Sequence, residues 1–266
     1  MDIVGYFAAV LIGISLGLIG GGGSILTVPL LVYLFGLPPV TAVSYSLFIV
    51  GITSLTGAYI NFKKGNASIT LALPLGIVSP ATVFVVRKYI VPHIPENLWM
   101  VQGFTVTKSA LTMILFAVLM LIASVSMLKK GDNQKATATR TRSMVDYMQL
   151  ALFGLGIGCV TGFLGAGGGF LIIPALVLLL QLPMKEAVGT SLFIIAINSL
   201  VGFGGDIGHY HIHWIFLLSI TAIATAGILI GIQLAKKIAS EKLKRGFGWF
   251  VLLTGTYIIL QELTAL

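Results

Sequence analysis

Long apolar stretches, almost free of charged residues, follow one another along the whole sequence. Only 9% of the residues are charged, 57% are hydrophobic and the mean hydropathy is +1.05, so too few polar side chains exist to cover a soluble globule of 266 residues. Most stretches are long enough to cross about 30 Å of hydrocarbon as helices. They lie at residues 3–19, 24–36, 40–61, 68–86, 103–128, 147–164, 169–181, 187–205, 214–235 and 247–264. The sequence therefore predicts an all-α, polytopic membrane protein with about 8–10 membrane segments.

Two of these stretches, 24–36 and 169–181, are too short to span a bilayer. About 13 residues that rise 1.5 Å each reach only about 20 Å. The sequence leaves open whether these two segments cross the membrane or enter and return.

The chain also contains an internal repeat. A shift of 145 positions aligns Gly17–Gly57 with Gly162–Gly202 without a gap, and 21 of the 41 aligned residues are identical. The identities include Pro29 with Pro174, and shared hydrophobicity alone would not align glycines and prolines in this way. We therefore predict a first transmembrane repeat at 1–128 and a second at 147–266, joined by a basic linker at 129–146.

The basic residues on loops predict how the two repeats are oriented. If all five stretches of each repeat cross, 13 of the 16 Lys and Arg residues lie on one side of the membrane, as expected for cytoplasmic loops. If each short stretch re-enters, the repeats are parallel, and the basic clusters at 129–146 and 236–245 face opposite sides. We therefore favour inverted repeats, a cytoplasmic linker and both termini outside. The formal net charge of +8 follows from these loops and requires no nucleic-acid partner.

A run of glycines precedes each short stretch. A helix that begins there offers unpaired backbone N–H groups and about half a positive charge, and glycine lets a ligand approach the backbone. Inverted repeats that are interrupted at matching positions point to a transporter site near the membrane midplane. Tight helix packing is the alternative, because small residues line membrane helix interfaces. The residues of this predicted anion site are Gly20, Gly21, Gly22, Gly23, the N-cap Ser24, Gly165, Gly167, Gly168 and Gly169.

Polar side chains on the third stretch of each repeat are further candidates for this site. Hydroxyl and amide groups can donate hydrogen bonds to the oxygens of an anion. Hydrogen bonding within the helix bundle is the alternative for each of them. The binding candidates are Ser46, Thr190, Ser191 and Asn198, and their polar neighbours are Ser44, Thr53, Ser54 and Ser199. Carboxylates are nearly absent from the apolar stretches, so the sequence predicts no metal site and no cofactor.

Two further features carry charge. Lys108 is the only cation inside a predicted stretch, where it could attract an anion or extend to the nearer membrane surface. His209, His211 and His213, with Asp206, could relay protons or bind a metal. Their position at the boundary of a stretch favours an interfacial loop instead.

The glycine-containing segments carry a resemblance to a known family. "GGGGSILTVP" and "GAGGGFLIIP", each followed by "LP" and then by "AVSYSLF" or "AVGTSLF", resemble the TauE/SafE family of sulfite exporters, also called the toluene sulfonate uptake permease family. The resemblance implies transport of sulfur-containing anions across a bacterial or archaeal inner membrane. The first repeat departs from the family pattern after residue 80 and lacks the small-residue spacing seen at Gly227 and Gly231, which argues against a site contribution from residues 80–100.

We predict a secondary transporter rather than an enzyme. It would export a small sulfur oxyanion or organosulfonate, such as sulfite or thiosulfate, by alternating access, with the substrate and the lipid bilayer as its partners. No nucleotide-binding motif, nucleophile–base set or buried acid pair is present, and the oligomeric state cannot be read from the sequence. The alternatives are a small-anion channel and a membrane-embedded metal or haem redox subunit with His209, His211, His213 and Cys159 as ligands.

Overall fold

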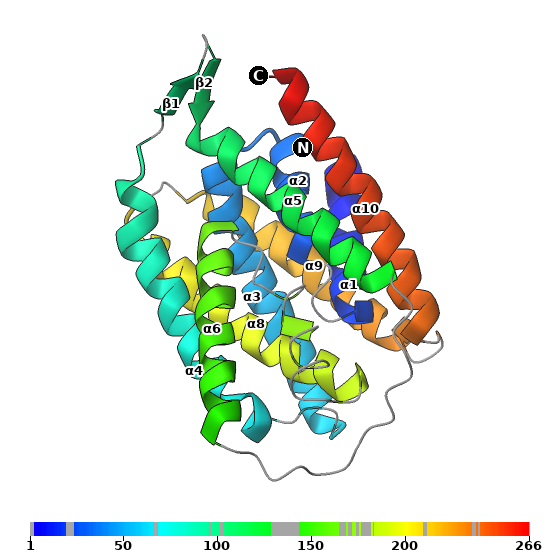
Figure 1. Ribbon diagram of the computed structural model, residues 1–266. Helices are drawn as coiled ribbons and strands as arrows, with labels where there is room; N and C mark the ends of the chain where they lie inside the picture. Colours follow the sequence, from blue (N-terminus) through cyan, green and yellow to red (C-terminus); the bar gives the residue numbers. More distant parts are fainter. Residues whose placement is uncertain are drawn as a thin grey trace.

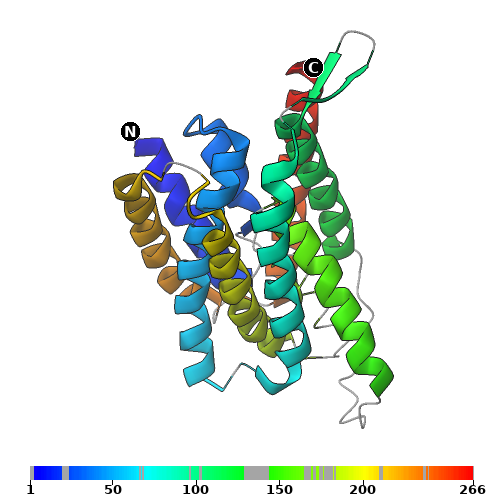
Figure 2. The same cartoon turned by 90° about the vertical axis from the view of Figure 1, so that its left-hand side faces the viewer.

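The protein is a bundle of helices that lie side by side (Figures 1 and 2). The computed structural model describes residues 3–19, 24–65, 67, 69–95, 97–101, 104–128, 144–164, 169, 172–173, 176, 182, 184–209, 212–235, 238 and 240–265. The α-helices are α1 (Ile3–Ile19), α2 (Ser24–Tyr33), α3 (Pro39–Lys63), α4 (Ile69–Val85), α5 (Lys108–Leu128), α6 (Met144–Leu164), α8 (Met184–Asp206), α9 (Trp214–Ala235) and α10 (Ser240–Ala265). The predicted all-α fold class is confirmed.

The helices follow the predicted apolar stretches closely. α1 and α9 coincide with the stretches at 3–19 and 214–235, and α2 is as short as predicted. Of the second short stretch, the structure describes Gly169, Ile172, Ile173 and Leu176, all of which are helical. Among the described residues, four helical segments are long and apolar enough to cross a membrane, namely Pro39–Lys63, Leu75–His93, Glu186–Asp206 and Trp214–Ala235. The chain is therefore a polytopic membrane protein.

A β-hairpin replaces the start of the helix predicted at 103–128. β1 (Asn97–Val101) pairs antiparallel with β2 (Phe104–Thr107), and α5 begins only at Lys108. Thr107 Oγ1 accepts a hydrogen bond from the Ala110 N–H at 3.2 Å, so Thr107 caps the helix. The β-branched residues Thr105 to Thr107 also favour a strand over a helix. The predicted helix start at residue 103 is therefore wrong.

α4 ends in irregular helical turns. A π-helical segment, η1 (Val86–Ile90), follows it directly, and a short 3₁₀ turn, η2 (Val91–His93), comes next. The apolar helical segment therefore extends to His93, several residues beyond its predicted end at 86. This extension brings Arg87 inside the segment.

The helices pack in pairs, and one such pair corresponds to another pair at positions shifted by 145 residues. α1 packs against α9, and the shifted pair, α6 against α4, packs in the same parallel direction. Gly13 lies against the Ala224 carbonyl, and at the shifted positions Gly158 lies against the Ser79 carbonyl. The two repeats thus make equivalent contacts at equivalent residues.

α3 and α8, the third helices of the two repeats, pack against each other in antiparallel directions. Leu192 packs over Gly57, and Leu47 packs over Gly202, which is the same contact after the shift. Two antiparallel helices make the same contact twice in this way only when a two-fold axis, perpendicular to both helices, relates one helix to the other. That axis passes halfway between the two contacts, near Ile52 and Ile197. These contacts support the prediction of inverted repeats.

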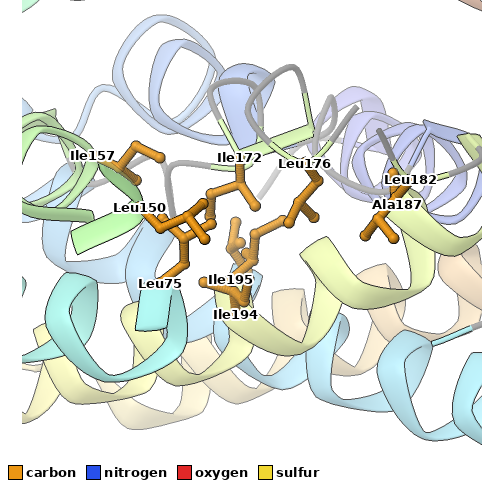
Figure 3. Close-up of a cluster of buried hydrophobic side chains, with 10 residues drawn as sticks. Leu75, Leu150, Ile157, Ile172, Leu176, Leu182, Ala187, Ile194 and Ile195 are labelled. Carbon is orange, nitrogen blue, oxygen red and sulfur yellow. The ribbon is translucent and has the colours of Figure 1, made fainter. Parts of the chain in front are cut away.

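The apolar core repeats as well. Figure 3 shows one buried cluster, which includes Leu75, Leu176, Ala187 and Ile194. The repeat-equivalent residues Ile220, Leu31, Ala42 and Ile49 all lie in a second cluster. The short segments also end alike, because the Leu37 N–H donates to Leu31 O at 3.1 Å and the Leu182 N–H donates to Leu176 O at 3.2 Å.

The described ends of the chain lie at the same end of the bundle as the hairpin (Figure 2). α3 ends and α6 begins at the opposite end. That both termini face one side of the membrane and the basic linker faces the other stays a prediction. The side that is cytoplasmic remains a prediction from the basic residues.

Candidate functional site

The glycine runs themselves lie almost entirely outside the described residues. This applies to Gly20, Gly21, Gly22, Gly23, Gly165, Gly167 and Gly168, whereas Ser24 begins α2 and Gly169 is helical and buried. Residues on both sides of the runs are described, however. Val28, four residues after Ser24, and Leu164, the last residue of α6, belong to one apolar cluster, and Leu18 and Phe163 pack against it. The flanks of the two predicted breaks therefore converge.

Several polar side chains are buried where α3 crosses α8. Thr53 and Ser54 on α3 and their repeat equivalents Asn198 and Ser199 on α8 are all fully buried. They lie within two residues of Ile52 and Ile197, between which the local two-fold axis passes. A polar residue near such an axis has its repeat equivalent close by. The two repeats therefore place two polar groups in the same small volume, from opposite directions.

Several of these groups form hydrogen bonds within the helix bundle, as the alternative interpretation expects. Thr53 Oγ1 donates to Ile49 O at 2.6 Å, and Ser191 Oγ donates to Val188 O at 2.8 Å. Asn198 Nδ2 donates to Ser79 Oγ on α4 at 2.8 Å. Thr190 is also fully buried.

Other buried polar atoms on α3 and α8 have no hydrogen-bond partner among the described residues. At the crossing they are the hydroxyls of Ser54 and Ser199 and the Oδ1 atom of Asn198, and further along α3 they are the hydroxyls of Ser44 and Ser46. A buried serine hydroxyl in a membrane helix ordinarily donates to a carbonyl of the preceding turn. Unpartnered buried polar groups are costly and mark places where a ligand or water binds. Ser54 and Ser199 are repeat equivalents, so each repeat contributes one such hydroxyl to the crossing.

Lys108 occupies a different position from the one predicted. It is the first residue of α5, partly buried, and its Nζ donates to the carbonyls of Val91 and Ile94. It therefore lies at a helix end and not five residues inside a membrane span. The Thr107 cap, which shortens the helix, is the physical reason.

Among the described residues, Arg87 is a buried cation inside the apolar helical segment Leu75–His93. Its side chain is 1% exposed and forms an ion pair with Asp206, which is 2% exposed. Arg87 Nε donates to Asp206 Oδ1 at 2.8 Å, and the terminal nitrogen Nη2 donates to Oδ2. The sequence analysis placed Arg87 one residue beyond the fourth apolar stretch and therefore missed this pair. Asp206, an acid at the end of a stretch, was the signal that could have revealed it.

The described histidines near Asp206 form no metal-binding group with it. His209 and His213 are exposed, and His211 lies outside the described residues. Within the described part of the chain, no group of three or more His, Cys, Asp or Glu side chains is arranged to hold a metal ion. The Asp206 carboxylate makes its described contacts with Arg87 instead.

A cavity of about 260 Å³ lies beside this ion pair. Arg87, Lys108 and Thr112 supply its polar groups, and the rest of the wall is apolar. Phe163 and Leu164, the last residues of α6 before the second glycine run, form part of that wall. The cavity therefore connects Arg87 with the flank of the predicted site.

Comparison with known proteins identifies the family. The profile of the family described as "Sulfite exporter TauE/SafE" matches residues 6–258, which include both glycine runs and most of every described helix. The chain belongs to the TauE/SafE family. No solved structure matches it.

Curated relatives of this TauE/SafE protein come from bacteria and an archaeon. It is 27% identical over 263 residues to a probable membrane transporter protein of Xylella fastidiosa strain Temecula1, with 96% of this chain and 94% of the relative covered. It is 28% identical to the probable membrane transporter protein YdhB of Bacillus subtilis (88% and 90% covered) and 27% identical to MJ0441 of Methanocaldococcus jannaschii (88% and 86% covered). The TauE/SafE chain is therefore a membrane transporter by family.

Proposed function

We propose that this protein is a secondary transporter that exports small sulfur-containing anions of the sulfite, organosulfonate or thiosulfate class across the inner membrane. Transport would proceed by alternating access, as one inverted repeat rocks against the other. The family description supports the sulfur anion. The observation that carries the proposal is the pairing of unpartnered, buried donors from the two repeats at the crossing of α3 and α8.

The donors at this crossing suit an anion. A hydroxyl group donates one hydrogen bond, and hydrogen bonds to an ionised acceptor are about twice as strong as those between neutral groups. Neither Ser54 nor Ser199 adds a charge, so an empty site leaves no isolated ion in the membrane. The helix starts expected after the two glycine runs would add backbone N–H groups from opposite directions.

The antiparallel packing of α3 and α8 also suits alternating access. Each repeat contributes an equivalent surface to the crossing, so exchanging the conformations of the two repeats would turn an outward-open state into an inward-open one.

Transport by the purified protein in proteoliposomes tests the proposal. We expect saturable uptake and counterflow of radiolabelled sulfite, methanesulfonate or thiosulfate. Replacing Gly22 or Gly167 by leucine should abolish this flux while the protein remains inserted, because a side chain there blocks the approach to the backbone. The proposal fails if none of the three anions is carried. A conductance without saturation or counterflow would indicate a small-anion channel instead.

A further inference from the structure

The ion pair between Arg87 and Asp206 connects the two repeats inside the membrane-spanning region. Arg87 belongs to η1 at the end of α4, whereas Asp206 ends α8 in the second repeat. Charged groups at such positions are costly unless they are paired, and they are retained where they serve transport. The question is therefore whether this pair only stabilises the fold.

The repeat-equivalent positions hold no ion pair. At a shift of 145 positions, Arg87 corresponds to Ile232 and Asp206 corresponds to Asn61. Ile232 lies in an apolar cluster with Ile12, and Asn61 Nδ2 donates to Gly57 O in its own helix at 2.9 Å. Because the repeat packs in the same way with neutral residues, helix packing does not require the two charges.

The surroundings of Arg87 provide room for a ligand. Arg87 lines the cavity of about 260 Å³ described above, whose wall includes the end of α6 before the second glycine run. Its Nη1 atom makes only a long hydrogen bond, 3.4 Å to Gly162 O. With the two bonds to Asp206, the described contacts use three of the five N–H groups of the guanidinium. η1 is π-helical, and π-helical segments inside helices frequently occur at functional sites.

We propose that Arg87 and Asp206 form an exchange site for one transported anion and one proton. This inference rests on the proposed function and names how the transport is coupled. An oxyanion would bind the guanidinium in place of the Asp206 carboxylate, because two oxygens of a sulfonate or of sulfite can accept the same pair of parallel N–H bonds. Asp206 would then take a proton from hydronium, at an oxygen that Arg87 has released. One O–H bond of hydronium breaks and leaves water, one O–H bond forms on the carboxylate, and nothing is oxidised or reduced.

The proton follows from the cost of a buried charge. A carboxylate that loses its cation in the low-dielectric interior is strongly disfavoured in its ionised form. The empty site is neutral as the Arg87–Asp206 pair, and the loaded site is neutral as the Arg87–anion pair with a protonated Asp206. The half-loaded states carry an unpaired charge, so the anion and the proton move together. Export therefore occurs when the outward gradient of the anion exceeds the inward gradient of the proton.

Other charged groups lie close to this site. Lys108 lines the cavity with Arg87, and its Nζ donates to the carbonyls of Val91 and Ile94. Lys88, also on η1, is exposed and lies over the rings of Phe84 and Tyr89. On the Asp206 side of the bundle, the exposed His209 donates its backbone N–H to Asp206 O at 3.0 Å. α6 presents the Gly162 carbonyl, and α3 presents the Tyr45 hydroxyl, which accepts a hydrogen bond from the His213 backbone N–H.

The test uses methanesulfonate, whose own charge does not change between mildly acidic and mildly basic buffers. In wild-type proteoliposomes, an inward pH gradient should drive accumulation of radiolabelled methanesulfonate, and a trapped pH dye should report entry of protons with it. Asp206→Asn should lose gradient-driven accumulation by about tenfold, yet retain counterflow at equal pH within about twofold, because the amide imitates the protonated acid. Arg87→Gln should lose both activities, since the guanidinium that offers two parallel N–H bonds to the anion is gone.

Lys88→Gln is the matched control, because it removes a neighbouring cation that is exposed, and it should behave as the wild type does. Gel filtration verifies that each variant is folded. Gradient-driven accumulation that persists in Asp206→Asn would overturn the inference, and so would methanesulfonate transport by the wild type without proton entry. The second result requires no variant to fold. If the wild type carries no methanesulfonate, sulfite or thiosulfate at all, the proposed function itself has failed.

Discussion

At the scale of single residues, neighbouring polar groups on α3 behave differently. Thr53 donates to the carbonyls of its own helix, whereas the hydroxyl of Ser54, the next residue, is buried without a described partner. The sequence predicted a polar site on this helix, but it could not distinguish the two, because hydrogen bonding depends on the rotamer and on the facing helix. Arg87 was missed for a related reason. The π-helical turn that carries it into the interior leaves no mark in a hydropathy pattern.

This difference predicts opposite effects on stability. Ser54→Ala should raise the unfolding temperature, because it removes a buried, unpaired hydroxyl that costs about 1–3 kcal/mol. Thr53→Val should leave stability unchanged or lower it by about 1 kcal/mol, since its hydroxyl is already satisfied. Thermal unfolding of the two variants in detergent makes the comparison. A fall in stability for Ser54→Ala would mean that this hydroxyl has a structural partner.

At the scale of elements, glycines allow the paired helices to approach closely. Gly13 and Gly17 on α1 face Gly227 and Gly231 on α9. The repeat equivalents of Gly227 and Gly231 are Thr82 on α4 and Val86 at the start of η1. α6 still accommodates them, because Gly158 and Gly162 lie directly against these larger residues. The first repeat therefore lacks the small-residue spacing of the family, yet α4 still packs closely against α6. Helix positions were predictable from apolar length, but the hairpin was not, since Phe104 and Val106 continue the apolar stretch that becomes α5.

Two glycines on one helix test this packing. A side chain at Gly158 would lie 2.6 Å from Thr82 Cβ, whereas nothing lies within 4 Å of the corresponding position at Gly156. Gly158→Leu should therefore destabilise the protein by at least about 1–3 kcal/mol through overpacking of α4 against α6. Gly156→Leu is the matched control and should be neutral or slightly stabilising, because leucine favours a helix over glycine. Equal unfolding temperatures for the two variants would contradict the described packing.

At the scale of the whole molecule, the repeat could be predicted from 21 identities, and its inversion from the distribution of basic loops. The antiparallel contacts of α3 and α8 support that inversion. What the sequence could not supply is the asymmetry between the repeats. The Arg87–Asp206 pair is found in one place, and its shifted equivalent is Ile232 and Asn61, so the two ends of the bundle differ in charge.

The inversion makes a direct prediction about topology. Lys64 follows α3, and its repeat equivalent His209 follows α8. In a Cys159→Ser background, Lys64→Cys should be labelled by an impermeant thiol reagent only from the cytoplasmic side, and His209→Cys only from the outside. Parallel repeats would expose both cysteines to the same side, and that labelling pattern would exclude the inverted arrangement.

Counterflow of radiolabelled sulfite in proteoliposomes tests the central claim most directly. The wild type should exchange sulfite saturably, and the double variant Ser54→Ala/Ser199→Ala should lose about tenfold or more, because two hydrogen bonds to an anion are worth about 1.5–3 kcal/mol each. Thr256→Ala, which removes an exposed hydroxyl bonded to Leu252 O on α10, should exchange sulfite as the wild type does. Undiminished counterflow in a folded double variant would contradict a substrate site at the crossing of α3 and α8.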